Sequence, residues 1–396
     1  MPLRTVRHVI AIFATVIAFL AFGGVAQAAP VAAPAPPASD PFYNVPADLA
    51  KHKPGTVLKW RPITFVRQGN TVPVAASQVF YRSTGELGQP IGGVTTILRP
   101  LVPVFPDRIV SFHMEYDALG SQCDPSYTLR GGPDGKAGQL ETDIILSYLA
   151  SGHTVVVPDY EGLKEEWTIG HQSGQLALDG IRAAENSLRL PRSTKVAMVG
   201  YSGGSVPTGF GSAIAPKYAP DLNLIGSAAG GVLVTPAHNL NYVNGSNDWS
   251  GVIPALVVSY SRAYGFDTSF LSPKGQSIVN TVSTQCIASF ASKYPGLTDT
   301  SMLNPPNTSL TQIPELAAAM ARNDMTKAGR PEIPTFLAVG QIKGQIGDGV
   351  MITNDVRGLG QQWNSSFLRY GGLSHYAAFI PFERDAAIFL QQQFAR

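Results

Sequence analysis

A serine framed by glycines is the part of this sequence most clearly suited to chemistry. Gly200-Tyr201-Ser202-Gly203-Gly204 follows the apolar run 196–199 and precedes a stretch of small residues. A strand that turns sharply into a helix here would lift the Ser202 hydroxyl above a sheet, and glycine leaves room in so sharp a turn. A serine hydroxyl is a poor nucleophile until a base takes its proton. The pattern therefore predicts a nucleophile at Ser202, which needs a base, an acid and an oxyanion site.

The base is sought among the histidines that follow Ser202. In folds built around such a turn, the order along the chain is serine, then acid, then histidine. Only His238 and His375 come after Ser202. His375 lies in a loop between the last predicted strand and the last predicted helix, whereas His238 precedes the later strands. We therefore expect His375 to be the base.

The acid should lie just after the predicted strand 333–340. Asp348 is the first carboxylate in that position, and Asp355 is its rival on the helix that follows. We expect Asp355 to face solvent and Asp348 to hold the imidazole tautomer and stabilise the imidazolium. The loop before Asp348 is long for this role.

A tetrahedral intermediate needs two hydrogen-bond donors for its oxyanion. One is expected to be the backbone N–H of Gly203, the residue after the nucleophile. The second should come from the loop after the third core strand, which ends at Tyr116-Asp117. The residues alone favour Asp117 as an ordinary turn residue and leave the second donor open.

The elements that must position these residues alternate between strand and helix. Strands are predicted at 57–66, 77–83, 91–98, 108–114, 153–157, 195–199, 223–227, 333–340 and 366–370, and helices at 139–151, 171–188 and 376–394. This alternation predicts an α/β protein with a mainly parallel sheet covered on both faces and an antiparallel hairpin at one edge. Such a sheet with a nucleophile turn is typical of the α/β-hydrolase fold.

The alternation breaks between residues 235 and 330. This region combines a turn-rich polar stretch at 239–250 with apolar helical segments at 252–264 and 313–320. We interpret it as a mainly helical cap inserted over the site. The hydrolase core is then expected in two parts, at 41–234 and 331–396.

The N-terminus has the pattern of an export signal. Arg4 and Arg7 precede the apolar run 9–25, and Ala26-Gln27-Ala28 resembles a cleavage site. We expect a signal peptide at 1–28, cleaved after about Ala28, and a secreted protein. The alternative is a membrane anchor, for which the apolar run is slightly short. Residues 29–40 are rich in alanine and proline and predict a flexible leader.

The chain contains two cysteines, Cys123 and Cys286. After export they would meet an oxidising compartment, where a disulfide is favoured over two unconnected buried thiols.

Charge argues against nucleic acid as a partner. Without Arg4 and Arg7 the chain has 27 basic and 27 acidic residues, and no basic run stands out. Asp159-Tyr160-Glu161 has no partners at metal-ligand spacing, so we expect a structural loop there, with no metal and no cofactor.

Several motifs together resemble the secretory lipase family, typified by Candida lipase A. They are Glu115-Tyr116-Asp117-Ala118, Cys123-Asp124-Pro125-Ser126-Tyr127, Asp159-Tyr160-Glu161-Gly162, Leu178-Asp179-Gly180-Ile181-Arg182-Ala183 and Gly200-Tyr201-Ser202-Gly203-Gly204. The resemblance runs from about Pro41 to the C-terminus. It implies an α/β-hydrolase with an inserted cap, a nucleophile at Ser202, oxyanion donors at Asp117 and Gly203, and a disulfide between Cys123 and Cys286. The segments around Asp348 and His375 resemble the family's acid and histidine loops.

The expected function is hydrolysis of carboxylic esters, in particular lipid esters, by a secreted lipase or esterase. Ser202, His375 and Asp348 would act through an acyl-enzyme, and the protein would meet its substrate in solution or at a lipid–water interface. Two alternatives stay open. The same triad serves an acyltransferase, and a hydrolase fold can also serve as a non-catalytic binding protein.

Overall fold

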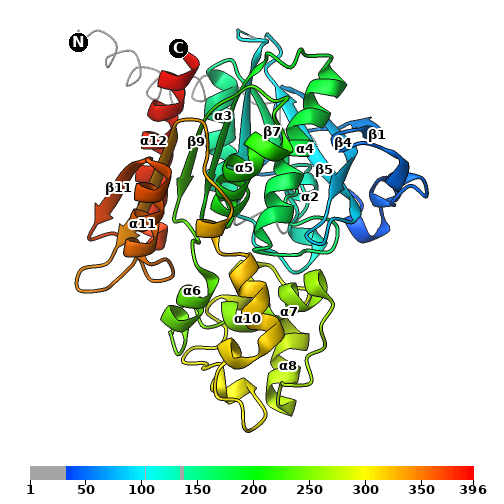
Figure 1. Ribbon diagram of the computed structural model, residues 1–396. Coiled ribbons are helices and arrows are strands. Elements are labelled where there is room, and N and C mark those ends of the chain that lie inside the picture. Colours follow the sequence, from blue (N-terminus) through cyan, green and yellow to red (C-terminus); the bar gives the residue numbers. More distant parts are fainter. Residues whose placement is uncertain (1–32, 103, 134–137) are drawn as a thin grey trace.

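The computed structural model describes residues 33–102, 104–133 and 138–396, and a nine-stranded sheet forms its centre (Figure 1). The strand order is β1-β4-β5-β7-β6-β8-β9-β10-β11. Their bounds are Val57–Pro62, Ala75–Thr84, Pro90–Arg99, Thr154–Pro158, Arg108–His113, Lys195–Tyr201, Leu224–Gly230, Thr335–Gln341 and Ser366–Gly371, in that order. From β7 to β11 all neighbouring pairs are parallel, while β1, β4 and β5 form an antiparallel edge. The predicted α/β-hydrolase sheet with its antiparallel edge is confirmed.

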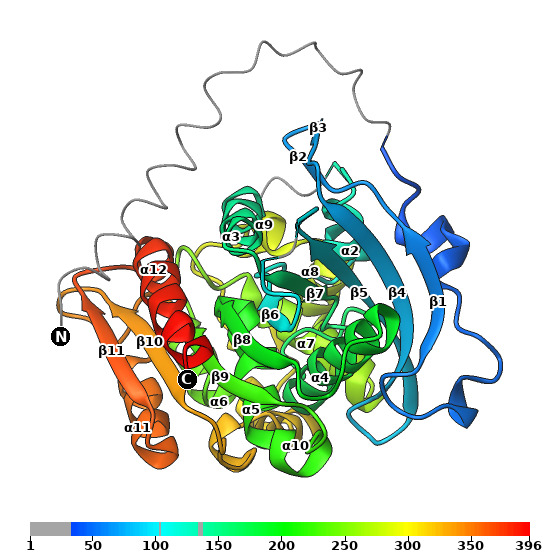
Figure 2. The same ribbon diagram turned by 90° about the horizontal axis from the view of Figure 1, so that it is seen from above.

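Helices cover both faces of this sheet (Figure 2). One face carries α3 (Gln139–Ala150) and α12 (His375–Phe394), and the other carries α4 (Gly170–Leu188), α5 (Ser205–Tyr218) and α11 (Thr353–Trp363). Every residue of β7 is buried, as expected of a parallel strand covered on both sides. Successive residues of β8 point to opposite faces of the sheet. Val199 packs in the core beneath α3 and α12, and Met198 packs in the core beneath α4. The sheet therefore holds the ends of its central strands at fixed positions.

The segment between β9 and β10 is mainly helical and lies below the sheet in Figure 1. It contains α6 (Pro236–Val243), α7 (Val252–Tyr264), α8 (Pro273–Val282), α9 (Ile287–Phe290) and α10 (Pro314–Arg322). The helices predicted at 252–264 and 313–320 are α7 and α10. Helix α6 was not predicted; it has Pro236 in its first turn and buries Leu240 and Val243 against the rest of this segment.

The N-terminal part of the described chain differs from the expected leader. Pro37–Ser39 form a 3-10 turn whose Pro37 is buried, and the Asp40 carboxylate pairs with Arg61 at 2.6 Å and Arg130 at 3.5 Å. Residues 37–40 are therefore part of the fold. Proline restricts their backbone, and the two arginines form ion pairs with the Asp40 carboxylate. The expected signal peptide at 1–28 lies outside the described residues. Within the described ranges, no helix combines the length and apolar character needed to span a membrane.

Candidate active site

The nucleophile turn forms where β8 meets α5. β8 ends at Tyr201, Ser202–Gly204 make a short 3-10 turn, and α5 begins at Ser205. Ser202 has a φ of 51°, a left-handed conformation that costs energy for any residue with a side chain. A Cβ on Gly200 would lie 2.2 Å from the Gly204 carbonyl oxygen, so a larger residue cannot fit there. The strained turn predicted around Ser202 is therefore present, and steric crowding requires its first glycine.

The structure brings Ser202, His375 and Asp348 together in one hydrogen-bonded row. His375 Nε2 lies 2.7 Å from Ser202 Oγ, and His375 Nδ1 lies 2.8 Å from Asp348 Oδ2. All three residues are buried. The backbone N–H of His375 also donates to the Asp348 carbonyl oxygen at 2.8 Å, which fixes the start of α12 against the Asp348 loop. This arrangement can draw the proton from the serine hydroxyl.

The long loop before Asp348 folds back on itself. The N–H of Ile342 donates to the Gly347 carbonyl oxygen at 2.9 Å, so residues 342–347 project outward and return the chain to the end of β10. Asp348 Oδ1 then accepts hydrogen bonds from the N–H groups of Val350 at 3.1 Å and Met351 at 2.7 Å. These contacts hold the carboxylate and leave its other oxygen to His375.

The two rival residues meet each other away from Ser202. His238 Nδ1 lies 2.9 Å from Asp355 Oδ2, and the His238 side chain is 59% exposed. Asp355 lies on α11, as expected, but its side chain is only 20% exposed and does not simply face solvent. Neither residue belongs to the row that includes Ser202.

Charge near His375 favours its protonated form. Burial by itself would lower the pKa of His375, but the carboxylates of Asp348, Glu115 and Asp117 outweigh burial and raise the pKa above its ordinary value. A protonated imidazole formed during a reaction would therefore be stabilised where it stands.

Asp117 and Gly203 lie side by side next to Ser202. A Cβ on Gly203 would come within 1.9 Å of Asp117 Oδ1, so the carboxyl group covers this glycine. Trp167 Nε1 donates to the same oxygen at 2.5 Å, and Asp117 has a φ of 34°. Burial raises the pKa of Asp117 to about 6. The residue that looked like an ordinary turn residue is therefore held in a strained position beside Ser202.

The loop that carries Asp117 is tied to the segment between β9 and β10. Cys123 and Cys286 form a disulfide, which confirms the expected bridge. The N–H of Ile287 donates to the Asp117 carbonyl oxygen at 2.9 Å. Next to this hydrogen bond, the backbones of Ala118 and Cys286 pair as in an antiparallel sheet. Glu161 Oε2 accepts the N–H of Ala118 at 2.9 Å, in keeping with a structural role for the 159–161 loop.

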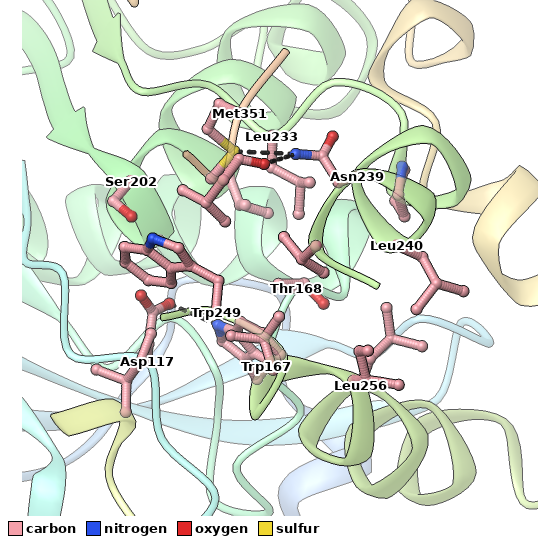
Figure 3. Close-up of a pocket in the computed structure, with 18 residues that line it drawn as sticks. Asp117, Trp167, Thr168, Ser202, Leu233, Asn239, Leu240, Trp249, Leu256 and Met351 are labelled. Carbon is pink, nitrogen blue, oxygen red and sulfur yellow. Dashed lines mark hydrogen bonds between the residues drawn. The ribbon is translucent and has the colours of Figure 1, made fainter. Parts of the chain in front are cut away.

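An apolar cavity opens directly beside Ser202 (Figure 3). Its empty space, part of which is open to solvent, amounts to about 630 Å³, and Asp117, Ser202 and Gly203 line one side of it. Its remaining walls come mainly from α6, α7 and neighbouring loops, and include Trp167, Leu240, Val243, Trp249, Ile253, Leu256 and Met351. Asn239 also lines the cavity, and its amide donates to the carbonyl oxygen of Val350, another lining residue, at 2.5 Å (Figure 3). The cavity suits a hydrocarbon chain attached to a group at Ser202.

Sequence reasoning missed the aromatic residues that enclose this arrangement. The Trp249 ring stands edge-on to His375 at 5.5 Å and stacks on Tyr376 at 5.2 Å. The Tyr201 hydroxyl donates to the His375 carbonyl oxygen at 2.6 Å. The motif quoted for the nucleophile contains Tyr201, but Trp249 and Trp167 carry no local signal, since each acts through a residue far away in the sequence.

Comparison with known proteins identifies the family of this chain. The family model described as "Secretory lipase" matches residues 133–368. Lipase A of Moesziomyces aphidis is 31% identical over 317 residues, which cover 76% of this chain and 68% of the relative. A Mycobacterium tuberculosis protein named a probable inactive lipase is 38% identical over 230 residues, covering 56% of this chain and 51% of that protein.

Solved structures give the same result. Candida antarctica lipase A in its closed state has a TM-score of 0.81 and 27% sequence identity, covering 92% of this chain and 87% of that one. The esterase LipA of Xanthomonas oryzae, at 17% identity and a TM-score of 0.67, shares the fold. The family model spans more than half of the chain and includes Ser202 and Asp348. The chain belongs to the secretory lipase family, and it is an enzyme of the carboxylic ester hydrolase class.

Proposed function

We propose that this protein is an exported hydrolase of lipid esters that works through Ser202, His375 and Asp348. The observation that carries the proposal is the continuous row from Ser202 Oγ through both nitrogens of His375 to Asp348, placed at the edge of an apolar cavity. A nucleophile, a base and an orienting acid in this order are what ester hydrolysis by serine requires.

The proposed reaction proceeds through an acyl-enzyme. Ser202 Oγ bonds to the ester carbonyl carbon while its proton passes to His375 Nε2, and the carbonyl electrons move to the oxygen. Gly203 and Asp117 stabilise that oxyanion. The intermediate collapses, and the alcohol leaves with the proton from His375. Water then attacks the acyl-enzyme by the same route, which releases the fatty acid and restores the Ser202 hydroxyl.

The cavity supports a hydrocarbon acyl group as the preferred substrate part. Its walls are almost entirely apolar, and burying a methylene group there contributes about 0.8 kcal/mol. Because α6 and α7 supply much of the lining, we place the acyl-binding cap at residues 235–330. The expected preference is for esters with acyl chains long enough to fill this space.

Exposed apolar side chains near His375 support contact with a lipid surface. Tyr376 and Ile380, one turn apart on α12, are 66% and 53% exposed, and Ile346 in the projecting loop is 58% exposed. Tyr376 lines a groove shared with Gln345 and His375, so this face borders the site. We propose that it meets the lipid–water interface. Export would follow from the signal peptide at 1–28, in keeping with the secretory family.

A chain-length series of nitrophenyl esters and emulsified triglycerides tests this function in wild type and Ser202→Ala. Turnover that rises with acyl length and disappears in Ser202→Ala is expected. Turnover that survives in Ser202→Ala would refute the role of Ser202. Activity on short soluble esters alone would restrict the substrates to those of an esterase.

The alternatives need two further measurements. Failure of a fluorophosphonate to label Ser202, together with no turnover, would favour a non-catalytic binding protein; the M. tuberculosis relative is itself named a probable inactive lipase. An added alcohol that takes the acyl group in preference to water would favour an acyltransferase.

A further inference from the structure

A second hollow borders the row of Ser202, His375 and Asp348. Its empty space, part of which is open to solvent, amounts to about 1080 Å³. Ser202 lines the apolar cavity, whereas His375 and Asp348 line this second hollow. Of the residues described, Trp249 is the only one that lines both, so its ring forms part of the wall between them. We call the second hollow the polar groove; the reaction above assigns no ligand to it.

The polar groove is lined by side chains that form hydrogen bonds, in contrast to the apolar cavity. Its lining includes an amide at Gln345, a carboxylate at Asp248 and hydroxyl groups at Tyr242, Ser246 and Ser292. These residues come from α6, from the loops that follow α6 and α9, and from the projecting loop 342–347. The same elements that enclose the cavity therefore present a polar surface on their other side.

Several of these groups are free to bind a ligand. The Tyr242 hydroxyl donates to Gln345 Oε1 at 2.9 Å, and the amide N–H groups of Gln345 have no partner among the described residues. Ser246 Oγ accepts the N–H groups of Asp248 and Trp249 at 3.2 Å each, which leaves its own O–H to donate. Asp248 is exposed and forms no ion pair within the described part of the chain. The groove thus offers donors and one charged acceptor.

The two hollows match the two halves of an ester. An acyl chain in the apolar cavity places the carbonyl carbon at Ser202. When the bond from that carbon to the alcohol oxygen breaks, His375 gives its proton to the oxygen, so the alcohol must lie next to the imidazole. His375 lines the polar groove and not the cavity, and the Trp249 ring stands edge-on to it at 5.5 Å. The alcohol half of the substrate therefore extends into the polar groove.

The charge and polarity of the groove decide which alcohols fit it. Its described lining contains the Asp248 carboxylate but no lysine or arginine, so an alcohol that carries a phosphate would be repelled. A plain alkyl alcohol would displace water from polar groups without replacing the lost hydrogen bonds, which is unfavourable. A neutral alcohol with several hydroxyl groups can donate to Asp248 and accept from Gln345 and Ser246.

We propose that the polar groove is the leaving-group site and that it takes neutral polyhydroxy alcohols such as glycerol. The substrates are then partial esters of polyols, with one hydrocarbon acyl chain in the cavity and free hydroxyl groups in the groove. The inference rests on the proposed function of Ser202. Its consequence is that a glycerol monoester is cleaved faster than the ester of an alkyl alcohol of the same length. Two added hydrogen bonds should raise kcat/KM by at least about fivefold.

The test compares kcat/KM, measured by pH-stat, for glycerol monobutyrate and propyl butyrate, which differ only in two hydroxyl groups. The ratio of the two rates is divided by the same ratio for alkaline hydrolysis, which removes their intrinsic difference in reactivity. Wild type should give a corrected ratio of about five or more. In the double variant Gln345→Leu/Asp248→Leu the corrected ratio should fall toward one. Lys343→Leu is the matched control, because Lys343 is exposed in the same projecting loop and does not line the groove, and it should keep the wild-type ratio.

A third ester, butyryl glycerol phosphate, tests the role of charge and should be cleaved more slowly than glycerol monobutyrate. Four outcomes would overturn the inference: a corrected wild-type ratio of one, a double variant that keeps the wild-type ratio, a ratio lost in Lys343→Leu, or a preference for the phosphate ester. Turnover that survives in Ser202→Ala, or no turnover of any of the three esters, refutes the proposed function itself and is recognised separately.

If the double variant fails to fold, the wild type still decides. The acyl-enzyme formed from nitrophenyl butyrate is offered glycerol and propan-1-ol at equal concentration. The alcohol oxygen attacks the acyl carbon, its proton passes to His375 and then to Ser202 Oγ, and the new ester leaves. Glycerol monobutyrate should be the main ester formed, because the attacking alcohol occupies the same site as the leaving one. Equal or greater formation of propyl butyrate refutes the inference.

Discussion

Removal of the disulfide should lower the stability of the protein by a large and calculable amount. The Cys123–Cys286 bridge joins residues 163 positions apart, a long closed loop in the unfolded chain. In the chain-entropy model a loop of this length contributes about 5 kcal/mol to the free energy of unfolding. The double variant Cys123→Ser/Cys286→Ser keeps the neighbouring backbone hydrogen bonds, so the loss should come mainly from the unfolded state.

The assay is equilibrium unfolding in urea, followed by circular dichroism. Typical unfolding free energies are about 5–15 kcal/mol, so a loss of this size should move the midpoint strongly. A reductant should bring the wild type to the midpoint of the variant and leave the variant unchanged, which is the internal control.

Loss of the disulfide should also affect the site, because Cys286 lies beside Ile287, whose N–H donates to the Asp117 carbonyl oxygen. The double variant should therefore lose ester turnover at lower urea concentrations than the wild type. A stability loss below about 1 kcal/mol would refute the chain-entropy reasoning. Equal loss of turnover in both proteins, at the same urea concentration, would show that the bridge does not support Asp117.

Further predictions concern single residues. Asp348→Asn should lower kcat by about three to four orders of magnitude, while Asp355→Asn should leave it near wild type; equal effects would contradict the assignment of the acid. Gly203→Ala should lower kcat about 100-fold or more, since its Cβ would lie 1.9 Å from Asp117 Oδ1, and steady-state kinetics with an intact thermal transition would show it. Glu383→Gln should stabilise the protein as pH rises: burial raises the pKa of Glu383 to about 8 from 4.5, so its ionisation costs up to about 5 kcal/mol above pH 8 and nothing below pH 4. Unfolding at pH 5 and pH 9 measures the last effect, and a difference that does not grow with pH would disprove it.

Much of the fold could be predicted because its elements have local patterns. The apolar run before Ser202 and the small residues after it indicate a strand and a helix without reference to any other part of the chain. The order of strands and helices then indicates the sheet. Local patterns failed at α6, where a turn-rich polar stretch became helical because Leu240 and Val243 found apolar partners in the inserted segment. They also failed at Asp40, whose partners are distant arginines.

The site residues also fall into those that local patterns predicted and those that depend on contacts between distant parts of the chain. By itself, the sequence was enough to identify Ser202 and His375 as candidates, because a short motif and the order along the chain carry that information. The sequence also favoured Asp348 over Asp355, but only the tertiary structure shows the contacts that separate them: a loop folds back to bring Asp348 to His375, and Asp355 meets His238 instead. The physical reason is that a hydrogen bond requires its two heavy atoms to lie within about 3 Å of each other. Residues more than a hundred positions apart come this close only through the strand order, which is a property of the whole sheet.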